Sequence, residues 1–171
     1  MRRLAILRHA KSSWGDPDLD DFNRPLNERG WKAARRMGRE LKHRGIRFDL
    51  VLASTAARVR ETIDGVQEKY EFDAPIQFEQ GIYLASAGTL LALVRELPDS
   101  TGAPLIVGHN PGLERLLVEL THDDSDGHRQ RIATKYPTGA LAVIELPVKR
   151  WVDVVPGSGE IVELILPKDL D

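Results

Sequence analysis

Four basic residues of this chain could together hold and transfer an anionic group. In chain order they are Arg8, His9, Arg58 and His109. A guanidinium group makes planar, bidentate contacts with phosphoryl oxygens, which an ammonium group cannot make. One neutral imidazole can attack phosphorus and carry it as phosphohistidine, while a second can donate a hydrogen bond to the oxygens that gain charge. Each residue taken singly has an ordinary structural explanation, but the set favours phosphoryl transfer.

These side chains can meet only if the elements that carry them end at one place. Short apolar runs predict buried parallel strands at Leu4–Leu7, Asp49–Ala53 and Pro104–Val107, with a weaker strand at Ile76–Phe78. The four basic residues follow the first three of these runs, and Ser54 stands beside them. In open α/β sheets, ligands bind outside the carboxyl ends of the strands. We therefore expect a phosphate pocket at that edge, near the N-termini of the helices that follow.

The rest of the pattern fits the same architecture. Helical periodicity predicts helices over residues 27–43, 56–70, 86–97 and from 111 onward. Asn27 is a suitable N-cap, Gly45 a suitable stop, and Asn110-Pro111 an N-cap followed by a proline at the first helical position. We predict β structure at residues 140–146, 151–155 and 161–166, with an exposed loop at 122–128. The expected fold is α/β, a three-layer α/β/α sandwich with a mainly parallel central sheet in a single domain over residues 1–171.

Composition excludes several other classes of protein. The chain has 171 residues, 42% of them hydrophobic, and no cysteine, so disulfide scaffolds and cysteine-ligated metal sites are excluded. The first nine residues hold four apolar residues between charged ones, too few for a signal peptide, and no apolar run approaches membrane-spanning length. We therefore expect a cytoplasmic protein that has no membrane partner.

Charge is distributed unevenly along the chain. Residues 1–47 hold 13 Lys and Arg against 6 Asp and Glu, a formal charge of +7, although the whole chain carries -2. Much of this charge lies on one face of the first predicted helix, at Lys32, Arg35, Arg36, Arg39 and Lys42. That face is either a solvated surface or a docking surface for an acidic protein. Nucleic acid is not expected as a partner, because no aromatic residues or nucleic-acid motif accompany the charge.

The ordered motifs resemble those of a known family. Residues 7–10, Leu-Arg-His-Ala, resemble the Arg-His-Gly signature of the histidine phosphatase superfamily, which has the phosphoglycerate-mutase-like fold. Ser54, Arg58 and Thr62 are similar to its second-arginine segment, and residues 107–112 are similar to its second-histidine loop. Arg24-Pro25-Leu26 followed by Gly30 also resembles the family's entry into the first helix. The resemblance covers the chain from residue 4 to about residue 143, and it is greatest to the SixA-type phosphohistidine phosphatase branch.

The resemblance implies a role for each of the basic residues. His9 would be the phosphorylated nucleophile, and Arg8, Arg58 and His109 would form the phosphate pocket. Arg24 would be a further phosphate contact, and no metal or cofactor would be required. The sequence departs from the signature at Ala10, which replaces the glycine, so the backbone there must suit a residue with a Cβ atom.

The sequence also bears on the substrate, through the lack of a clear proton donor. Asn110 stands where acid-phosphatase relatives carry an aspartate, and Glu79 is the one carboxylate expected near the rim, unless it is an ordinary surface glutamate. An imidazole, with a pKa of about 6.5, can leave without a new proton if its remote nitrogen is already protonated. The predicted strand and helices also occupy most of the segment between Arg58 and His109, so few residues remain to form a lid over a small substrate. An open pocket can admit a side chain presented by another protein.

We therefore expect a phosphatase that acts on protein phosphohistidine, for example on a histidine phosphotransfer domain. Two alternatives remain open, a small-molecule phosphomonoesterase and a non-catalytic module that binds phosphoproteins. The sequence does not predict an oligomeric state.

Overall fold

A six-stranded sheet in the order β3-β2-β4-β1-β5-β6 forms the centre of the computed structural model, which describes residues 1–170. The strands are β1 (Arg2–Arg8), β2 (Leu50–Ala53), β3 (Ile76–Phe78), β4 (Pro104–Gly108), β5 (Leu141–Leu146) and β6 (Glu160–Ile165). The α-helices are α1 (Glu28–Arg44), α2 (Ala57–Gln67), α3 (Ala87–Arg95), α4 (Gly112–Leu120) and α5 (His128–Thr134). The pairs β1–β4, β4–β2 and β2–β3 are parallel, and β5 runs antiparallel to both β1 and β6. The predicted mainly parallel sheet is confirmed.

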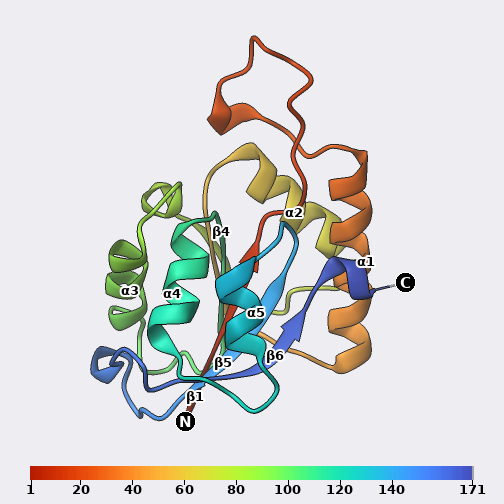
Figure 1. Cartoon of the computed structure of the whole chain (residues 1–171). Coiled ribbons are helices and arrows are strands. Elements are labelled where there is room, and N and C mark those ends of the chain that lie inside the picture. The colour runs from red at the N-terminus through yellow and green to blue at the C-terminus, as the bar shows by residue number, and fades with distance from the viewer. Residues whose placement is uncertain (171) are drawn as a thin grey trace.

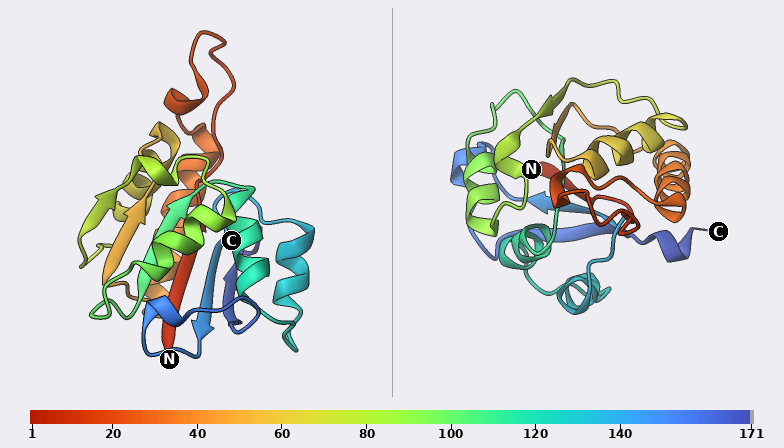
Figure 2. Two further views of the ribbon diagram at one scale, coloured as in Figure 1. Left: turned by 90° about the vertical axis from the view of Figure 1, so that its left-hand side faces the viewer. Right: turned by 90° about the horizontal axis from the view of Figure 1, so that it is seen from above.

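Alternation along the strands sends side chains to two separate cores. On β1, Leu4 and Ile6 pack with residues of α3, α4 and α5, whereas Ala5 and Leu7 pack with residues of α1 and α2. Both faces of the sheet are therefore covered by helices, as Figures 1 and 2 show. Parallel strands buried on both faces require such near-continuous apolar runs. The three-layer sandwich predicted from the sequence is confirmed.

The register of the sheet brings the strand ends to one level. Arg8 lies beside Gly108 on the neighbouring strand, and Ala53 lies beside Val107. The next residue of each strand segment, His9, Ser54 or His109, therefore leaves the sheet at the same edge. The caps predicted for the first helix are also observed. Asn27 accepts a hydrogen bond from the N–H of Gly30 at α1, and Gly45 ends that helix in the left-handed conformation.

Three local predictions need correction. Helix α5 was not predicted, and it begins where the exposed loop ends. Residues 151–155 do not form a strand but contain a 3-10 helix, Trp151–Asp153. Trp151 and Val154, three residues apart, are both buried while Val152 is exposed, which is a one-turn spacing rather than the two-residue alternation of a strand. At α4 the N-cap position is occupied by Pro111, after a cis peptide bond with Asn110, so the helix begins one residue later than predicted.

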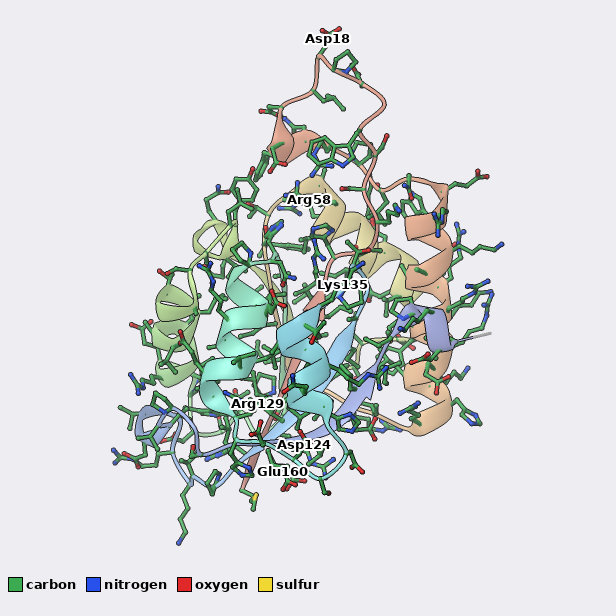
Figure 3. The ribbon with its side chains drawn as sticks, in the orientation of Figure 1. Asp18, Arg58, Asp124, Arg129, Lys135 and Glu160 are labelled. Carbon is green, nitrogen blue, oxygen red and sulfur yellow. The ribbon has the colours of Figure 1, made fainter. Side chains whose placement is uncertain are left out.

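A long polar loop rises above the carboxyl edge of the sheet. It covers residues 12–25, and Figure 3 places Asp18 at its tip and Arg58 below it. An antiparallel bridge between Ser12 and Leu26 closes the base of the loop. The loop contains a short 3-10 helix, η1 (Asp21–Asn23). Just beyond it, Gly30 allows close packing of α1, because a Cβ atom there would lie 2.1 Å from the carbonyl oxygen of Lys11.

The basic face predicted on the first helix lies on the outside of α1. Lys32, Arg39 and Lys42 are exposed, and Arg35 forms an ion pair with Glu68, the residue that caps the C-terminus of α2. Ion pairs of this exposed kind contribute little to stability. Within residues 1–170 no helix combines the length and the apolar character needed to cross a membrane.

Candidate active site

His9 lies at the end of β1 with its ring in a defined tautomer. Its Nδ1 atom lies 2.7 Å from the carbonyl oxygen of Ala10, which can only accept a hydrogen bond, so Nδ1 carries the proton. The lone pair is therefore on Nε2, toward which the Nε–H of Arg58 points at 3.3 Å. Burial lowers the pKa of His9 to about 3; the hydrogen bond to Ala10 opposes this effect, and the nearby His109, Arg58 and Arg8 reinforce it. The ring is neutral at physiological pH, as a nucleophile must be.

Arg8 is held against the chain that precedes β5. Its Nη1 donates to the carbonyl oxygen of Tyr136 at 3.1 Å. Its Nε is buried and has no hydrogen-bond partner among residues 1–170. Burial and the positive charge of Arg58 lower the pKa of the guanidinium, while Glu114 raises it, but an arginine side chain remains charged in proteins. A buried cationic N–H with no protein acceptor is suited to an anionic ligand.

Arg58 reaches the pocket from the first turn of α2 and is 2% exposed. Besides the contact with His9, its Nη1 donates to the backbone oxygen of Asp21 at 2.7 Å and its Nη2 donates to the carboxylate of Asp21 at 3.0 Å. Thr62, one turn later, donates to the carbonyl oxygen of Arg58 and accepts from the N–H of Ala10. This threonine therefore fastens α2 to the end of β1 and fixes the distance between His9 and Arg58.

His109 follows β4, and its ring centroid lies 5.3 Å from that of His9. Its Nε2 lies 2.7 Å from the hydroxyl of Ser54, which also accepts from the N–H of Ala56. Ser54 can donate its own proton to Nε2, and Nδ1 then carries the ring proton of neutral His109. Nδ1 is buried and without a protein partner among the described residues. Burial, with the charge of Arg58, lowers the pKa of His109 to about 4.

The four predicted residues therefore lie together at the carboxyl edge of the sheet, in a cluster that we call the pocket, and their free groups complement each other. His9 offers a lone pair, while Arg8 Nε and His109 Nδ1 offer N–H groups that the protein leaves unpaired. Such an arrangement can bind a tetrahedral anion and place its central atom beside Nε2 of His9.

Arg24 lies in the loop above this pocket rather than beside His9. Its guanidinium donates to Ser12, to Ser13 and to the carboxylate of Asp21. It also stacks on the ring of Trp14, 3.5 Å from the ring centroid. Trp14 itself is 78% exposed. The contacts of Arg24 hold the loop together, and its role as a phosphate contact stays a prediction.

Asp21 and Tyr83 are pocket residues that the sequence did not single out. The carboxylate of Asp21 accepts from Arg58, from Arg24 and from the hydroxyl of Tyr83, the last at 2.5 Å. The ring of Tyr83 packs edge-on against His109, with 5.3 Å between centroids. The loop sequence holds four aspartates, at residues 16, 18, 20 and 21, without a period that distinguishes one of them. No local signal in the loop therefore marks Asp21.

The structure also shows where Glu79, Asn110 and Ala10 lie. Glu79 is exposed at the end of β3. The amide of Asn110 donates to the carbonyl oxygen of Tyr136, the same oxygen that holds Arg8. Ala10 is buried, and Leu84 is the one non-glycine residue with a positive φ within residues 1–170. The backbone at Ala10 therefore does not need glycine.

One cluster of side chains away from His9 contains residue types that commonly bind metal ions. Ligand atoms of Asp124, Asp126 and His128 lie within 4.8 Å of one another. The carboxylate of Asp124 already accepts hydrogen bonds from the N–H groups of His128 and Arg129. The cluster is thus explained as the start of α5, and Figure 3 shows Asp124 far from Arg58.

Comparison with known proteins agrees with this geometry. Residues 4–83 match the model of the histidine phosphatase superfamily, branch 1. An uncharacterised protein of Mycobacterium tuberculosis is 32% identical over 164 residues, which is 95% of this chain and 100% of that protein. A solved structure from Agrobacterium tumefaciens, provisionally assigned as the phosphohistidine phosphatase SixA, is 30% identical with a TM-score of 0.82, and 97% of this chain aligns with 98% of that one.

A second solved structure has the same fold at lower identity. It is the protein histidine phosphatase SixA complexed with tungstate, which is 20% identical with a TM-score of 0.80, over 99% of each chain. The sequence motifs, the sheet order and the similarity to these proteins all indicate the same family. This chain belongs to the histidine phosphatase superfamily.

Proposed function

We propose that this protein is a phosphatase that hydrolyses phosphohistidine on a protein through a covalent phospho-His9 intermediate. The observation that carries the proposal is the state of His9, a buried neutral imidazole whose Nε2 lone pair faces the Nε–H of Arg58. Two unpaired N–H groups, on Arg8 and His109, stand beside it. A phosphoryl group bound there has a nucleophile on one side and hydrogen-bond donors around its equatorial oxygens.

The first step of the proposed reaction transfers the phosphoryl group to His9. The lone pair of Nε2 attacks phosphorus, the bond from phosphorus to the leaving atom breaks, and its electron pair departs with the leaving group. The proton on Nδ1 remains hydrogen-bonded to Ala10. Two guanidinium groups offset the charge of the phosphoryl oxygens, so this chemistry requires no metal ion from the protein.

The second step releases phosphate. Water attacks phosphorus, the bond to Nε2 breaks, and its electron pair returns to the ring, while water loses one proton to solvent or to the phosphate. His9 is thereby restored with its proton on Nδ1. His109 and Arg8 donate hydrogen bonds to the phosphoryl oxygens in both steps, which stabilises the charge that builds up on them.

The leaving group supports phosphohistidine as substrate. Asp21 places a carboxylate at the pocket, and hydrogen bonds from Tyr83, Arg58 and Arg24 outweigh the effect of burial and lower its pKa to about 2. An acid that is ionised at neutral pH cannot protonate a departing alkoxide. Imidazole with a proton on its remote nitrogen leaves as a neutral molecule, so it needs no such donor.

A labelling experiment tests the proposal. The protein is mixed with a histidine phosphotransfer domain that carries radioactive phosphohistidine, and acid-labile label on this chain is followed together with free phosphate. We expect transient label on the native protein and none on the His9→Ala variant. Full turnover without any label at His9 would contradict the covalent route.

Two other activities are separated by the same assay. Other structural neighbours include a protein from Escherichia coli provisionally assigned as an α-ribazole-5'-P phosphatase, 17% identical with a TM-score of 0.69, so a small phosphate ester is the alternative substrate to test. A small-molecule phosphomonoesterase would turn over sugar phosphates faster than the phosphoprotein. A non-catalytic module would bind the phosphoprotein and release no phosphate. The cytoplasmic location and the acidic docking partner of α1 stay predictions.

A further inference from the structure

Asp21 is an unexpected group to find at the mouth of an anion pocket. It stands on η1, in the loop above the carboxyl edge of the sheet, and it brings a negative charge next to Arg58. Its carboxylate accepts four hydrogen bonds from three side chains, and its backbone oxygen accepts a fifth, from Arg58. A fixed anion here repels an incoming phosphoryl dianion unless something compensates for that charge.

Arg58 shows where this carboxylate lies relative to the nucleophile. The Nε of Arg58 points at Nε2 of His9, and its two terminal nitrogens are bound to Asp21. The carboxylate therefore lies one guanidinium group beyond the nucleophile, on the side of the loop. The donors that face His9, namely Arg58 Nε, Arg8 Nε and His109 Nδ1, are not used by Asp21. The phosphoryl group can bind them while Asp21 stays in place.

In-line displacement puts the leaving group opposite His9, toward the mouth of the pocket and the loop. In a phosphate ester the leaving atom is an oxygen, which gains negative charge as its bond to phosphorus breaks. In phosphohistidine the leaving group is an imidazole ring, which carries one positive charge before the bond breaks when its remote nitrogen is protonated. The negative charge of Asp21 disfavours the first leaving group and attracts the second.

We propose that Asp21 selects a substrate whose leaving ring is cationic before the bond breaks, so that the pocket prefers phosphohistidine to phosphate esters. This inference rests on the proposed function and deepens it. In the transfer step His9 keeps its N–H on the oxygen of Ala10, and the substrate ring keeps its remote N–H, whose positive charge the carboxylate of Asp21 offsets. The bond from phosphorus to the substrate nitrogen breaks, its electron pair stays on that ring, and no proton has to move.

The test compares two substrates on the Asp21→Asn variant. One is a peptide phosphorylated on histidine, and the other is para-nitrophenyl phosphate, an ester. We expect kcat/KM for the phosphohistidine peptide to fall about tenfold, because the charge that attracts the cationic ring is removed. We expect turnover of the ester to rise severalfold because a repulsive charge is removed. The matched control is Asp18→Asn, which removes the same charge from the exposed tip of the same loop and should leave the preference unchanged.

Each other outcome contradicts the inference in a distinct way. Equal losses on both substrates mean that Asp21 merely positions Arg58. Equal gains mean that Asp21 blocks the pocket without selecting a substrate. If the native protein does not turn over phosphohistidine, the proposed function and this inference fail together. If the native protein does so and the variant keeps the native ratio of the two kcat/KM values, this inference fails alone.

Discussion

The floor and the mouth of the pocket are built in opposite ways. The floor consists of Arg8, His9, Arg58 and His109, which are carried by strand ends and one helix start and are buried or nearly so. The mouth is formed by the loop of residues 12–25, which is mostly exposed and is held by polar contacts centred on Asp21 and Arg24. The floor is fixed by the core of the protein, whereas the mouth is fixed by a few hydrogen bonds. In a protein built in this way, substitutions in the loop can change which substrate is accepted, while the buried residues of the floor keep the same reaction.

The largest effect should come from the floor, at the proposed nucleophile. His9→Ala removes the atom that would attack phosphorus, so we expect turnover to fall by about ten thousandfold or below detection. Label trapping and phosphate release measure this loss, and circular dichroism and thermal unfolding check that the fold is intact. A folded variant with nearly native activity would mean that the phosphoryl group does not pass through His9.

The second prediction concerns proton binding at the floor. Burial lowers the pKa of His9 to about 3 and that of His109 to about 4, against about 6.5 in an unfolded chain. Both rings should therefore remain neutral at pH 5 in NMR titrations. If either buried ring titrates near pH 6.5, the proposed electrostatics of the pocket is wrong.

The same pKa values have a consequence for stability. Below pH 6.5 the unfolded chain binds protons at these two histidines that the folded protein does not bind, so the free energy of unfolding falls as the pH decreases toward 3 to 4. Above pH 6.5 this contribution is fully present. Urea unfolding between pH 7 and pH 4.5 measures it, and the His9→Ala variant should show a shallower dependence.

A smaller loss is expected when the orientation of His109 is disturbed. Ser54→Ala removes the hydroxyl that holds Nε2 of His109, so the ring is free to adopt the other tautomer. We expect kcat to fall about tenfold with little change in KM, because the contact matters most as charge builds up on the phosphoryl oxygens. An unchanged kcat in a stable variant would show that Ser54 does not position this histidine.

The smallest effect should come from the mouth. Trp14→Ala removes an exposed ring that stacks on Arg24, a contact of about 0.5–1 kcal/mol. We expect KM for a phosphoprotein to rise a few-fold while turnover of para-nitrophenyl phosphate stays native. Val155→Ala is a suitable control, since Val155 is also exposed and lies in the turn that contacts the far end of α4. A drop in kcat on both substrates would show that the loop also shapes the floor.

Local sequence patterns predicted much of this molecule because each pattern reflects a nearby physical constraint. The buried strands could be read from continuous apolar runs, and the caps at Asn27 and Gly45 from residue type alone. The strand predicted at residues 151–155 was wrong, because a β-rich composition does not distinguish a strand from an irregular segment that buries Trp151 and Val154 in one core. Helix α5 was missed because it has seven residues and one buried apolar side chain, Ile132.

By itself, the sequence determined the α/β sandwich and the four basic residues that follow its strands, because alternation, capping and strand ends are local properties. The tertiary structure alone decided which nitrogen of each histidine is free, since this depends on the oxygens of Ala10 and Ser54 that folding brings to each ring. It also decided which of four loop aspartates faces Arg58. A hydrogen bond between Asp21 and Arg58 joins residues distant in the chain, and no local pattern encodes the path of a polar loop.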